Sequence, residues 1–495
     1  MVALEDTNLI VYSAYANLPY SVISEDLENA LKTDFMNELD KIQERYIIYH
    51  QGMKFTAEGA NTDYVPAELR YKKAKKLINK EARFMFSVTP DILINNNVTD
   101  KTSKSSDYQE FINEVLDANS FSKKLLQSTR DCLIAGRVLA LVNFDEDSGI
   151  ELMFLNAKEF YYEMSGSETL ERLIVFYIIT DSTNTAEKRV KKKVYTMQNG
   201  YCHIKEIIYD GAGREIEILN EDLKTLLTVI PAKVIFNDGL SNDIVGESEI
   251  DDLKDYEAYY SKLANADMDA ERKGMNAIRY TIDASTGSTQ SLSSAPGAYW
   301  DLQSDDNGVE QKSASVGLVE STMGYSSPLK VTLDRVETAM HDQVSVPNIS
   351  NEKLQGIITS GKTLKAIYWD LVVRCDEKML TWKPAIKFLS KLIIDGSFLY
   401  PKTQKMYIPK PLTKMDYRID VVNNYPLLED ETEEKGTDLS EVAANTMSKK
   451  AYMKKWRGLT EDEVSEELKQ ILLEKNMFED SYLSSMGSPV SKSED

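Results

Sequence analysis

The chain has 495 residues, and its hydrophobic content of 42% is enough to build real cores, which excludes wholesale disorder. Its 80 acidic and 58 basic residues give a net charge of −22, so its surface repels phosphate. This charge argues against a protein that grips nucleic acid tightly. It is compatible with a protein that lets nucleic acid pass without sticking.

No residue cluster suggests metal binding or catalysis. Cys132, Cys202 and Cys375 lie far apart and form no C-x-x-C pair, so we expect reduced thiols in an intracellular protein. The three histidines are isolated and are more typical of ordinary side chains than of metal ligands or catalytic bases. We therefore expect no catalytic residue, no metal and no cofactor. The N-terminus lacks the features of a signal peptide and no run of about 18 apolar residues occurs, so we expect a soluble cytoplasmic product that does not span a membrane.

Helical patterns dominate the first 135 residues. Residues 24–50 carry an apolar stripe at helical spacing, and residues 107–119 and 121–135 indicate two further helices. A helix after Pro66 carries a basic face, which consists of Arg70, Lys72, Lys73, Lys75, Lys76 and Lys80. Such a face can be solvated, can contact a protein partner or can bind phosphate, and we favour the first two interpretations.

The hydrophobic period then changes from that of a helix to that of a strand. Residues 137–144 and 150–155 flank the turn DEDSG, and further strand-like runs cover 173–180, 192–197, 203–209 and 215–219. The sequence therefore predicts an α+β region that continues to about residue 237.

Two long helices bracket a small β insert in the middle of the chain. Ser248 can cap the first helix, which continues to about residue 273 and has acidic faces. The insert shows strand-like runs near 277–284, 298–302 and 309–314. The second helix is predicted to start with Ser327 as its cap and Pro328 at its first position.

Each of these helices carries an apolar stripe, marked by Leu253 and Tyr260 on the first and by Leu333 and Met340 on the second. Such stripes pack either inside one copy of the chain or against another copy. We favour packing between copies.

The C-terminal part is predicted to be largely helical. A helix begins near Ser360, and Pro384 lies inside its pattern, where the missing N–H and the ring should bend or break the helix. Strands are predicted at 406–409 and 417–422, followed by helical segments from about 426 to 477. The polar tail after them has too few bulky residues to order itself.

The stretch GIITSGKT, residues 356–363, matches the pattern G-x-x-x-x-G-K-[ST] of a phosphate-binding P-loop. A P-loop must follow a buried apolar strand, but the preceding residues SVPNISNEKLQ are too polar to form one. The chain also lacks the alternation of strands and helices that a P-loop domain requires. We therefore regard the match as a coincidence and keep a P-loop NTPase that uses Lys362 and Thr363 as the enzyme alternative.

Six segments carry a family resemblance through their order and spacing. They are YIIYHQGMKF (46–55), IAGRVLALVNFDEDSGIELMFLNAKEFYY (134–162), IPAKVIFND (230–238), GESEIDDLKDYEAYYSKLANADMD (246–269), SVPNISNEKLQGIITSGKTLKAIYWDL (345–371) and KKAYMKKWRGLTEDEVSEELKQILLEK (449–475). Together they resemble the portal proteins of tailed bacteriophages, in the type found in long-tailed phages of Gram-positive bacteria. The departures are Thr363, where the family usually has Ala, and residues 60–130, which match loosely.

The resemblance implies an α+β portal fold with a wing, two stem helices, a small β-rich clip, a tunnel loop, a kinked long helix and a helical crown. The wing would comprise residues 1–240 and 362–425, and the second of these segments contains the kinked helix. The stem helices would be 241–273 and 326–346, the clip 274–325 and the tunnel loop 347–361. Residues 426–495 would form the crown and a flexible tail.

The resemblance also implies a structural function without enzymatic activity. Twelve copies would form a ring at one capsid vertex of the virion, assembled in the host cytoplasm, through which double-stranded DNA is packaged and ejected. The implied partners are the terminase large subunit, the head–tail adaptor, the major capsid protein and the scaffolding protein. An acidic helical scaffold protein that forms no ring is the remaining alternative.

Two sets of residues would meet the DNA channel of such a ring. In the tunnel loop these are Asn351, Lys353, Gln355 and Gly356. On the first stem helix the acidic face of Asp251, Asp252 and Asp255 would line the channel and repel phosphate. The alternative for these aspartates is an ordinary solvated face.

The tunnel loop yields a prediction, because Lys353 is the only cation between Pro347 and Gly361. Copies of Lys353 around a ring would make a thin basic collar that holds DNA weakly. Lys353→Glu should therefore disturb DNA retention in filled capsids, and Lys362→Ala is its control. A silent Lys353→Glu, together with loss of nucleotide binding by the isolated protein in Lys362→Ala, would restore the P-loop hypothesis.

Overall fold

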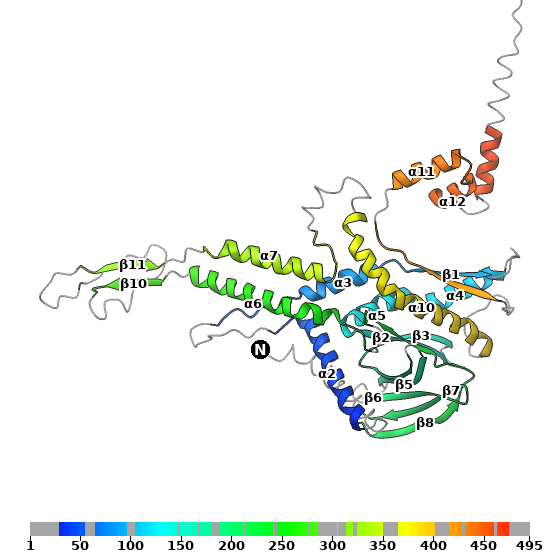
Figure 1. The fold of residues 1–495 in the computed structure, drawn as a ribbon, viewed down its shortest axis with the longest axis horizontal. Coiled ribbons are helices and arrows are strands. Elements are labelled where there is room, and N and C mark those ends of the chain that lie inside the picture. The colour runs from blue at the N-terminus through cyan, green and yellow to red at the C-terminus, as the bar shows by residue number, and fades with distance from the viewer. Residues whose placement is uncertain are drawn as a thin grey trace, which may run out of the picture. The chain divides into compact units, whose positions relative to one another are not determined.

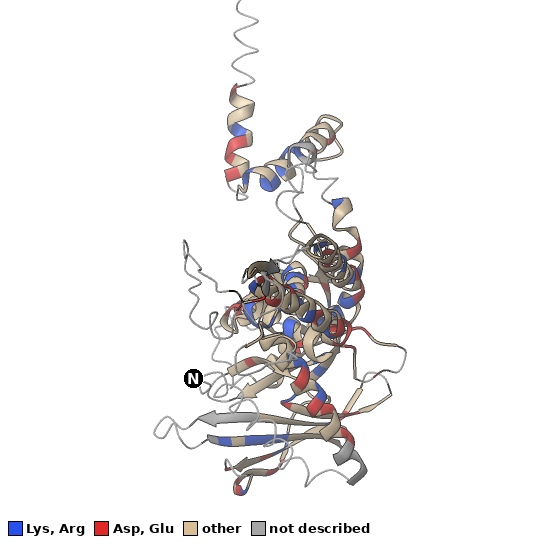
Figure 2. Cartoon of the chain, turned by 90° about the vertical axis from the view of Figure 1, so that its left-hand side faces the viewer, with Lys and Arg blue, Asp and Glu red and all other residues tan. Residues whose placement is uncertain are grey.

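The computed structural model describes the chain except for residues 1–28, 55–64, 97–103, 146–148, 167–168, 181–187, 211–212, 241–242, 244, 276–277, 285–303, 305–312, 320–323, 350–364, 401–415, 428–430, 460–462 and 475–495. It divides into two compact units. One lies within Met1–Asn348 and Tyr368–Pro426, and the other within Ile349–Ile367 and Leu427–Asp495. Charged residues of both signs are spread over the helices and strands, so the net charge of −22 does not form a uniform acidic coat (Figure 2).

Four helices come first in the described part of the chain, and they confirm the helices predicted there. They are α2 (Asn29–Gln51), α3 (Lys73–Phe86), α4 (Lys104–Ala118) and α5 (Phe121–Ala135) (Figure 1). The apolar stripe of α2 explains its position. Phe35 and Leu39 are buried in one cluster with side chains of a β-sheet, which are Ile174, Phe176, Val190, Val194, Ile207 and Tyr209.

That sheet has five antiparallel strands in the order β4-β5-β6-β7-β8. They are β4 (Phe160–Ser165), β5 (Thr169–Thr180), β6 (Lys188–Gln198), β7 (Tyr201–Tyr209) and β8 (Glu215–Lys224). A second sheet has the order β3-β2-β9, with β2 (Arg137–Asp145), β3 (Gly149–Asn156) and β9 (Ala232–Phe236). The predicted strands of this region are confirmed, whereas β4 and β9 were not predicted.

A third sheet joins distant parts of the sequence. Strand β1 (Asp91–Asn96) pairs antiparallel with β12 (Tyr417–Val422), with Asp91 opposite Val422. The predicted strand at 417–422 is confirmed, but β1 was not expected. The pairing ties the N-terminal helices to the segment that follows the long helix α10 (Trp369–Leu399).

The two long helices predicted around a β insert are α6 (Glu249–Met275) and α7 (Ser326–Gln343), which pack side by side (Figure 1). Between them in the chain, β10 (Ile278–Ile282) and β11 (Ser315–Val319) pair antiparallel. Strand β10 confirms the first predicted strand of the insert. The second, at 298–302, lies outside the described residues. Most of the third, at 309–314, also lies outside the described residues, and strand β11 at 315–319 was not predicted.

The predicted start of α7 is wrong by two residues. The helix begins at Ser326, and Tyr325 occupies the cap position without a side-chain hydrogen bond. Instead, the Tyr325 carbonyl accepts a backbone hydrogen bond from Leu329 at 3.0 Å. Pro328 then falls at the third helical position. Its missing N–H costs nothing there, because the backbone N–H groups of the first turn have no acceptor inside the helix.

Pro384 was expected to bend or break the long helix. Helix α10 runs through it without interruption, so the helix is not broken there. Its predicted beginning near Ser360 lies outside the described residues. The second unit contains α11 (Glu431–Ala443), α12 (Lys449–Arg457) and a helical stretch at 463–474, which confirms the helical C-terminal part. The predicted strand at 406–409 and the polar tail also fall in segments that the structure does not describe.

None of the helices in the described ranges is long and apolar enough to cross a membrane. Cys132, Cys202 and Cys375 are buried free thiols. Burial raises the pKa of all three, that of Cys202 to about 12, so they behave as apolar core side chains.

Candidate functional site at the base of the long helix pair

Helix α6 begins where three loops approach one another closely. Gly136 ends α5 and Gly246 precedes α6, and both have left-handed backbone, with φ of 90° and 75°. A Cβ on Gly246 would lie 2.1 Å from the Gly136 carbonyl oxygen, and a Cβ on Gly136 would lie 2.8 Å from the Gly246 oxygen. The Asn237 N–H donates to the Gly136 carbonyl at 2.8 Å. Only glycine allows this contact at both positions. The segments around residues 136, 237 and 246, which carry part of the family resemblance, therefore meet at one point.

Ser248 caps α6, as predicted. Its Oγ accepts a hydrogen bond from the Ile250 N–H at 3.2 Å and donates one to the Ile134 carbonyl at 2.5 Å. The side chain therefore satisfies one free N–H of the first turn and at the same time attaches the helix to the end of α5.

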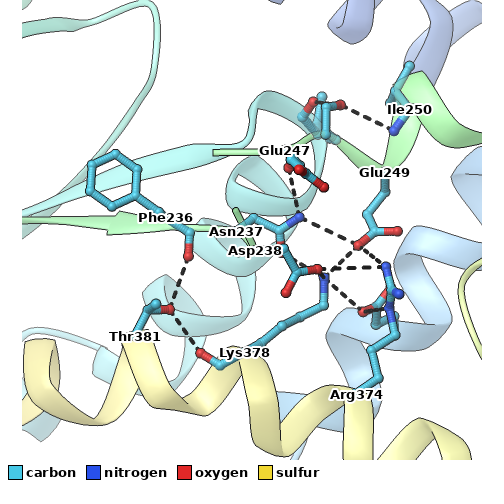
Figure 3. Close-up of polar contacts among 12 residues, drawn as sticks. Phe236, Asn237, Asp238, Glu247, Glu249, Ile250, Arg374, Lys378 and Thr381 are labelled. Carbon is cyan, nitrogen blue, oxygen red and sulfur yellow. Dashed lines mark hydrogen bonds and ion pairs between the residues drawn. The ribbon is translucent and has the colours of Figure 1, made fainter. Parts of the chain in front are cut away.

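A buried ionic cluster lies next to this cap. Lys378 of α10 places its Nζ 2.5 Å from Glu249 Oε1, 2.7 Å from Asn237 Oδ1, 3.2 Å from Asp238 Oδ2 and 3.3 Å from Glu81 Oε1 (Figure 3). Arg374, one turn earlier on α10, contacts Glu249 at 2.6 Å and Glu81 at 3.3 Å. We call this group the anchor cluster; its members are Glu81, Asn237, Asp238, Glu249, Arg374 and Lys378.

The carboxyl groups of the anchor cluster differ in protonation. Burial alone would raise the pKa of Glu249, but Lys378 and Arg374 outweigh burial and lower it, so Glu249 stays ionised. Burial raises the pKa of Glu81 to about 7, and the neighbouring Glu249 charge adds to the rise. Burial lowers the pKa of Lys378 less than the Glu81 and Glu249 carboxylates raise it, so the lysine stays charged.

The centre of the anchor cluster is suited to fixing the helix. The side chains of Glu81, Glu249 and Lys378 are at most 1% exposed, so no solute reaches them. Their charges come from α3, α6 and α10, and each cation contacts more than one carboxylate. The arrangement therefore holds the first turn of α6 against two other helices.

Further along α6, Glu257 makes a second connection to α3. It is fully buried, and its Oε2 accepts a hydrogen bond from the Ala74 N–H, in the first turn of α3, at 2.6 Å. A carboxylate at that position satisfies a free helix N–H and complements the helix dipole. Helix α7 is also joined to α3, because Lys73 of α3 pairs with Glu337 of α7 at 3.0 Å.

The predicted channel aspartates lie in different environments. Asp251 is held by Arg45 of α2, whose Nη2 is 2.5 Å away, and by Lys254 at 3.1 Å. Burial would raise the pKa of Asp251, but the Arg45 bond outweighs it and lowers the pKa. Asp252 and Asp255 are exposed. A channel role for these three stays a prediction, as does the role of the tunnel-loop residues Asn351, Lys353, Gln355 and Gly356, which lie outside the described residues together with GIITSGKT.

The prediction that both apolar stripes pack between copies is wrong for two of the four residues. Leu253 is 0% and Met340 1% exposed, so both belong to the core of a single copy. Tyr260 is half-buried, with Tyr71 edge-on at 5.3 Å and Lys73 Nζ 4.6 Å from its ring centre. The basic face of α3 supplies this contact, since Lys73 lies on the side of α3 that meets α6 and α7.

Sequence reasoning missed the anchor residues Glu81, Arg374 and Lys378. A signal was present, because Lys378 interrupts the apolar pattern of α10 next to Cys375 and Met379, and Glu81 interrupts that of α3 between Ile78 and Ala82. Single charges of opposite sign on two otherwise apolar helix faces are typical of a buried pair. Nothing in the sequence tells that these two faces meet.

Among the described residues, no group of His, Cys, Asp or Glu is arranged to hold a metal ion.

Three comparisons with known proteins bear on the chain. A family model described as "Phage portal protein, SPP1 Gp6-like" matches residues 28–480. No curated protein sequence matches the chain. Among solved structures, the neck of an empty gene transfer agent particle shares 8% identity and a TM-score of 0.38, and a native gene transfer agent virion shares 9% and 0.33; each match covers 79% of this chain and 89% of the other. With TM-scores this low, the family match is the finding that places the chain.

The anchor cluster predicts a large effect of a single substitution. Lys378→Met removes one buried cation and leaves Glu249 and Glu81 with Arg374 alone. Breaking a buried pair in this way typically lowers the free energy of unfolding by about 3–5 kcal/mol. Lys391→Met, at an exposed position of the same helix, should change it by less than about 0.5 kcal/mol. Chemical denaturation of both variants checks this, and equal midpoints would show that the cluster does not stabilise the fold.

Glu257 predicts a pH dependence of stability. Burial raises its pKa to about 7 from the ordinary value of 4.5, so the folded chain binds this proton more tightly than the unfolded chain does. The free energy of unfolding should therefore fall as the pH rises from about 4.5 to 7, and Glu81 contributes with the same sign. Glu257→Gln mimics the protonated form, so the melting temperature should decrease less between pH 5 and pH 8. Glu217→Gln, at an exposed position, is the control, and an unchanged slope in Glu257→Gln would contradict the assignment.

Proposed function

Because the chain belongs to the SPP1 Gp6-like family of phage portal proteins, we propose that its copies close into a ring at one capsid vertex and that double-stranded DNA passes through this ring. Packaging and ejection would use the same passage. The chain contributes a structural wall to this conduit and no chemistry of its own, so it needs no cofactor.

The observation that carries the proposal is the way α6 is anchored. This helix has 27 residues and is therefore about 40 Å long, at ~1.5 Å per residue. The anchor cluster, the Glu257 cap of α3 and the Arg45–Asp251 pair fix its first three turns from three directions. A conduit wall must keep its helices in one direction while DNA moves past, and this arrangement suits that need.

The parts of a portal can be assigned to the described elements. We assign the stem to α6 and α7, the clip to 274–325 with β10 and β11, and the wing to 1–240 with 362–425. The β1–β12 pairing and the packing of α10 on β2 and β9 support the union of the two wing segments. The crown would be 426–495, and the tunnel loop 347–361.

The partners follow from these assignments. The clip would meet the terminase large subunit during packaging and the head–tail adaptor afterwards, while the wing would face the major capsid and scaffolding proteins. A chain of net charge −22 would let DNA slide rather than stick. The loop around Lys353 is the segment we assign to DNA passage.

Imaging tests the proposal directly. Negative-stain micrographs and native mass spectrometry of the purified full-length chain should show closed rings, with about twelve copies as the expected number. Monomers or dimers at every concentration and salt would contradict the proposal and favour an acidic scaffold protein. Steady ATP turnover that Lys362→Ala abolishes would instead favour the NTPase alternative.

A further inference from the structure

The outer face of α3 carries an unpaired basic stripe, which we define as Lys72, Lys76, Lys80 and Arg83. Its opposite face is the buried one, since Ala74, Ile78 and Ala82 are 0% exposed. Lys76 lies two positions from both Ala74 and Ile78, and two positions are about 200° around a helix, so the stripe points away from the core. Within the described ranges, none of the four basic side chains has an ion-pair partner, and Lys72, Lys76 and Arg83 are exposed.

This stripe is unfavourable in an isolated copy. Lysines at spacing i, i+4 repel each other along the helix. Burial lowers the pKa of Lys80, the Lys76 charge lowers it further, and the Glu337 carboxylate of α7 offsets only part of this. The same two lysines also help to lower the pKa of His341 of α7, after burial. An anionic surface placed against the stripe would remove this repulsion.

The outer face of α6 is a second, oppositely charged surface, which we call the acidic face and define as Asp252, Asp255, Tyr256 and Tyr259. All four residues are exposed, and the exposed fraction reaches 52% at Tyr259. Burial raises the pKa of Asp252, and the nearby Glu249 carboxylate adds to the rise, although Arg374 offsets part of it. Asp251 is not part of it, because Arg45 already neutralises that carboxylate.

The two surfaces lie on different helices of one packed layer and do not face each other. Glu257 faces α3 through its 2.6 Å bond to the Ala74 N–H. Asp255 and Tyr259 each lie two positions from Glu257, about 200° around α6, and therefore on the side away from α3. The acidic face therefore points away from α3, and because the basic stripe lies on α3 itself, the two surfaces do not meet within one copy.

We propose that the basic stripe of one copy docks on the acidic face of the next copy around the ring. A closed ring needs two different, complementary surfaces on each copy, and a basic surface on α3 together with an acidic surface on α6 meets this requirement. A two-fold dimer would instead place like charges together. The tyrosines supply apolar contact area, and Leu69, which is 51% exposed just before the stripe, supplies it on the other side.

A second copy fits the stripe better than DNA does. The chain itself carries a matching acidic face. Its exposed tyrosines add apolar contact area that a phosphate backbone does not offer. The net charge of −22 also disfavours tight binding of DNA. The proposal rests on the ring of the proposed function and adds which surfaces close it.

Charge exchange between the two faces tests the proposal. Lys76→Glu with Lys80→Glu reverses the basic stripe, and Asp252→Lys with Asp255→Lys reverses the acidic face. Each pair should weaken assembly by about tenfold or more, because like charges then face each other. All four substitutions together should restore rings, which a folding defect could not do. Native mass spectrometry at low and high salt gives the ring fraction, and Lys123→Glu with Lys205→Glu, at exposed positions elsewhere, is the control.

The outcomes separate this interface from the proposed function. If the unsubstituted chain forms no rings, the ring itself is wrong. If it forms rings and the reversed pairs assemble equally well, only the interface is wrong. A filter-binding assay shows whether the chain retains duplex DNA in a salt-dependent way. If Lys76→Glu with Lys80→Glu abolishes this retention and leaves the rings unchanged, the stripe binds DNA instead. Unchanged rings with altered DNA passage in Asp252→Lys with Asp255→Lys would return the acidic face to the channel.

Discussion

The buried contact between Lys378 and Glu249 is the interaction on which the rest of the structure depends. It joins the first turn of α6 to α10 at 2.5 Å, and Arg374 and Glu81 complete it with charges from α10 and α3. Buried charges are costly unless each has its partners, so removing any one leaves the others with less compensation. The glycine contact between residues 136 and 246 brings the loops close enough for this cluster to form.

The acidic residues of α6 illustrate how one helix serves several purposes. Glu249 belongs to the anchor cluster, Asp251 is neutralised by α2, and Glu257 caps α3. Asp252 and Asp255 remain exposed on the other side. The helix is therefore not a uniformly acidic rod. Its acids are divided between internal connections, which set its direction, and an outward face, which is available to other molecules.

Local patterns were enough to predict most helices, four of the five strands of the five-stranded sheet and the cap at Ser248, because those features depend on residues close in sequence. They failed where distant residues decide. Strand β1 forms because β12, more than 300 residues later, pairs with it. Leu253 and Met340 were assigned to contacts between copies because a sequence does not tell which apolar stripe meets its own core. Lys378 was missed for the same reason, since its partners lie 129 and 141 positions away.

Native-state hydrogen exchange of the full-length chain tests the central claim, which is that the anchor cluster ties the base of α6 into the core. The account predicts that the amides of Ile250 and Leu253 exchange as slowly as those of Leu139 and Leu141 in β2, through global unfolding only. The amides of residues 266–272, which lie beyond the anchored turns, should exchange faster through local opening. If the amides at 250 and 253 exchange as fast as those at 266–272, α6 opens independently of the core and the claim is contradicted.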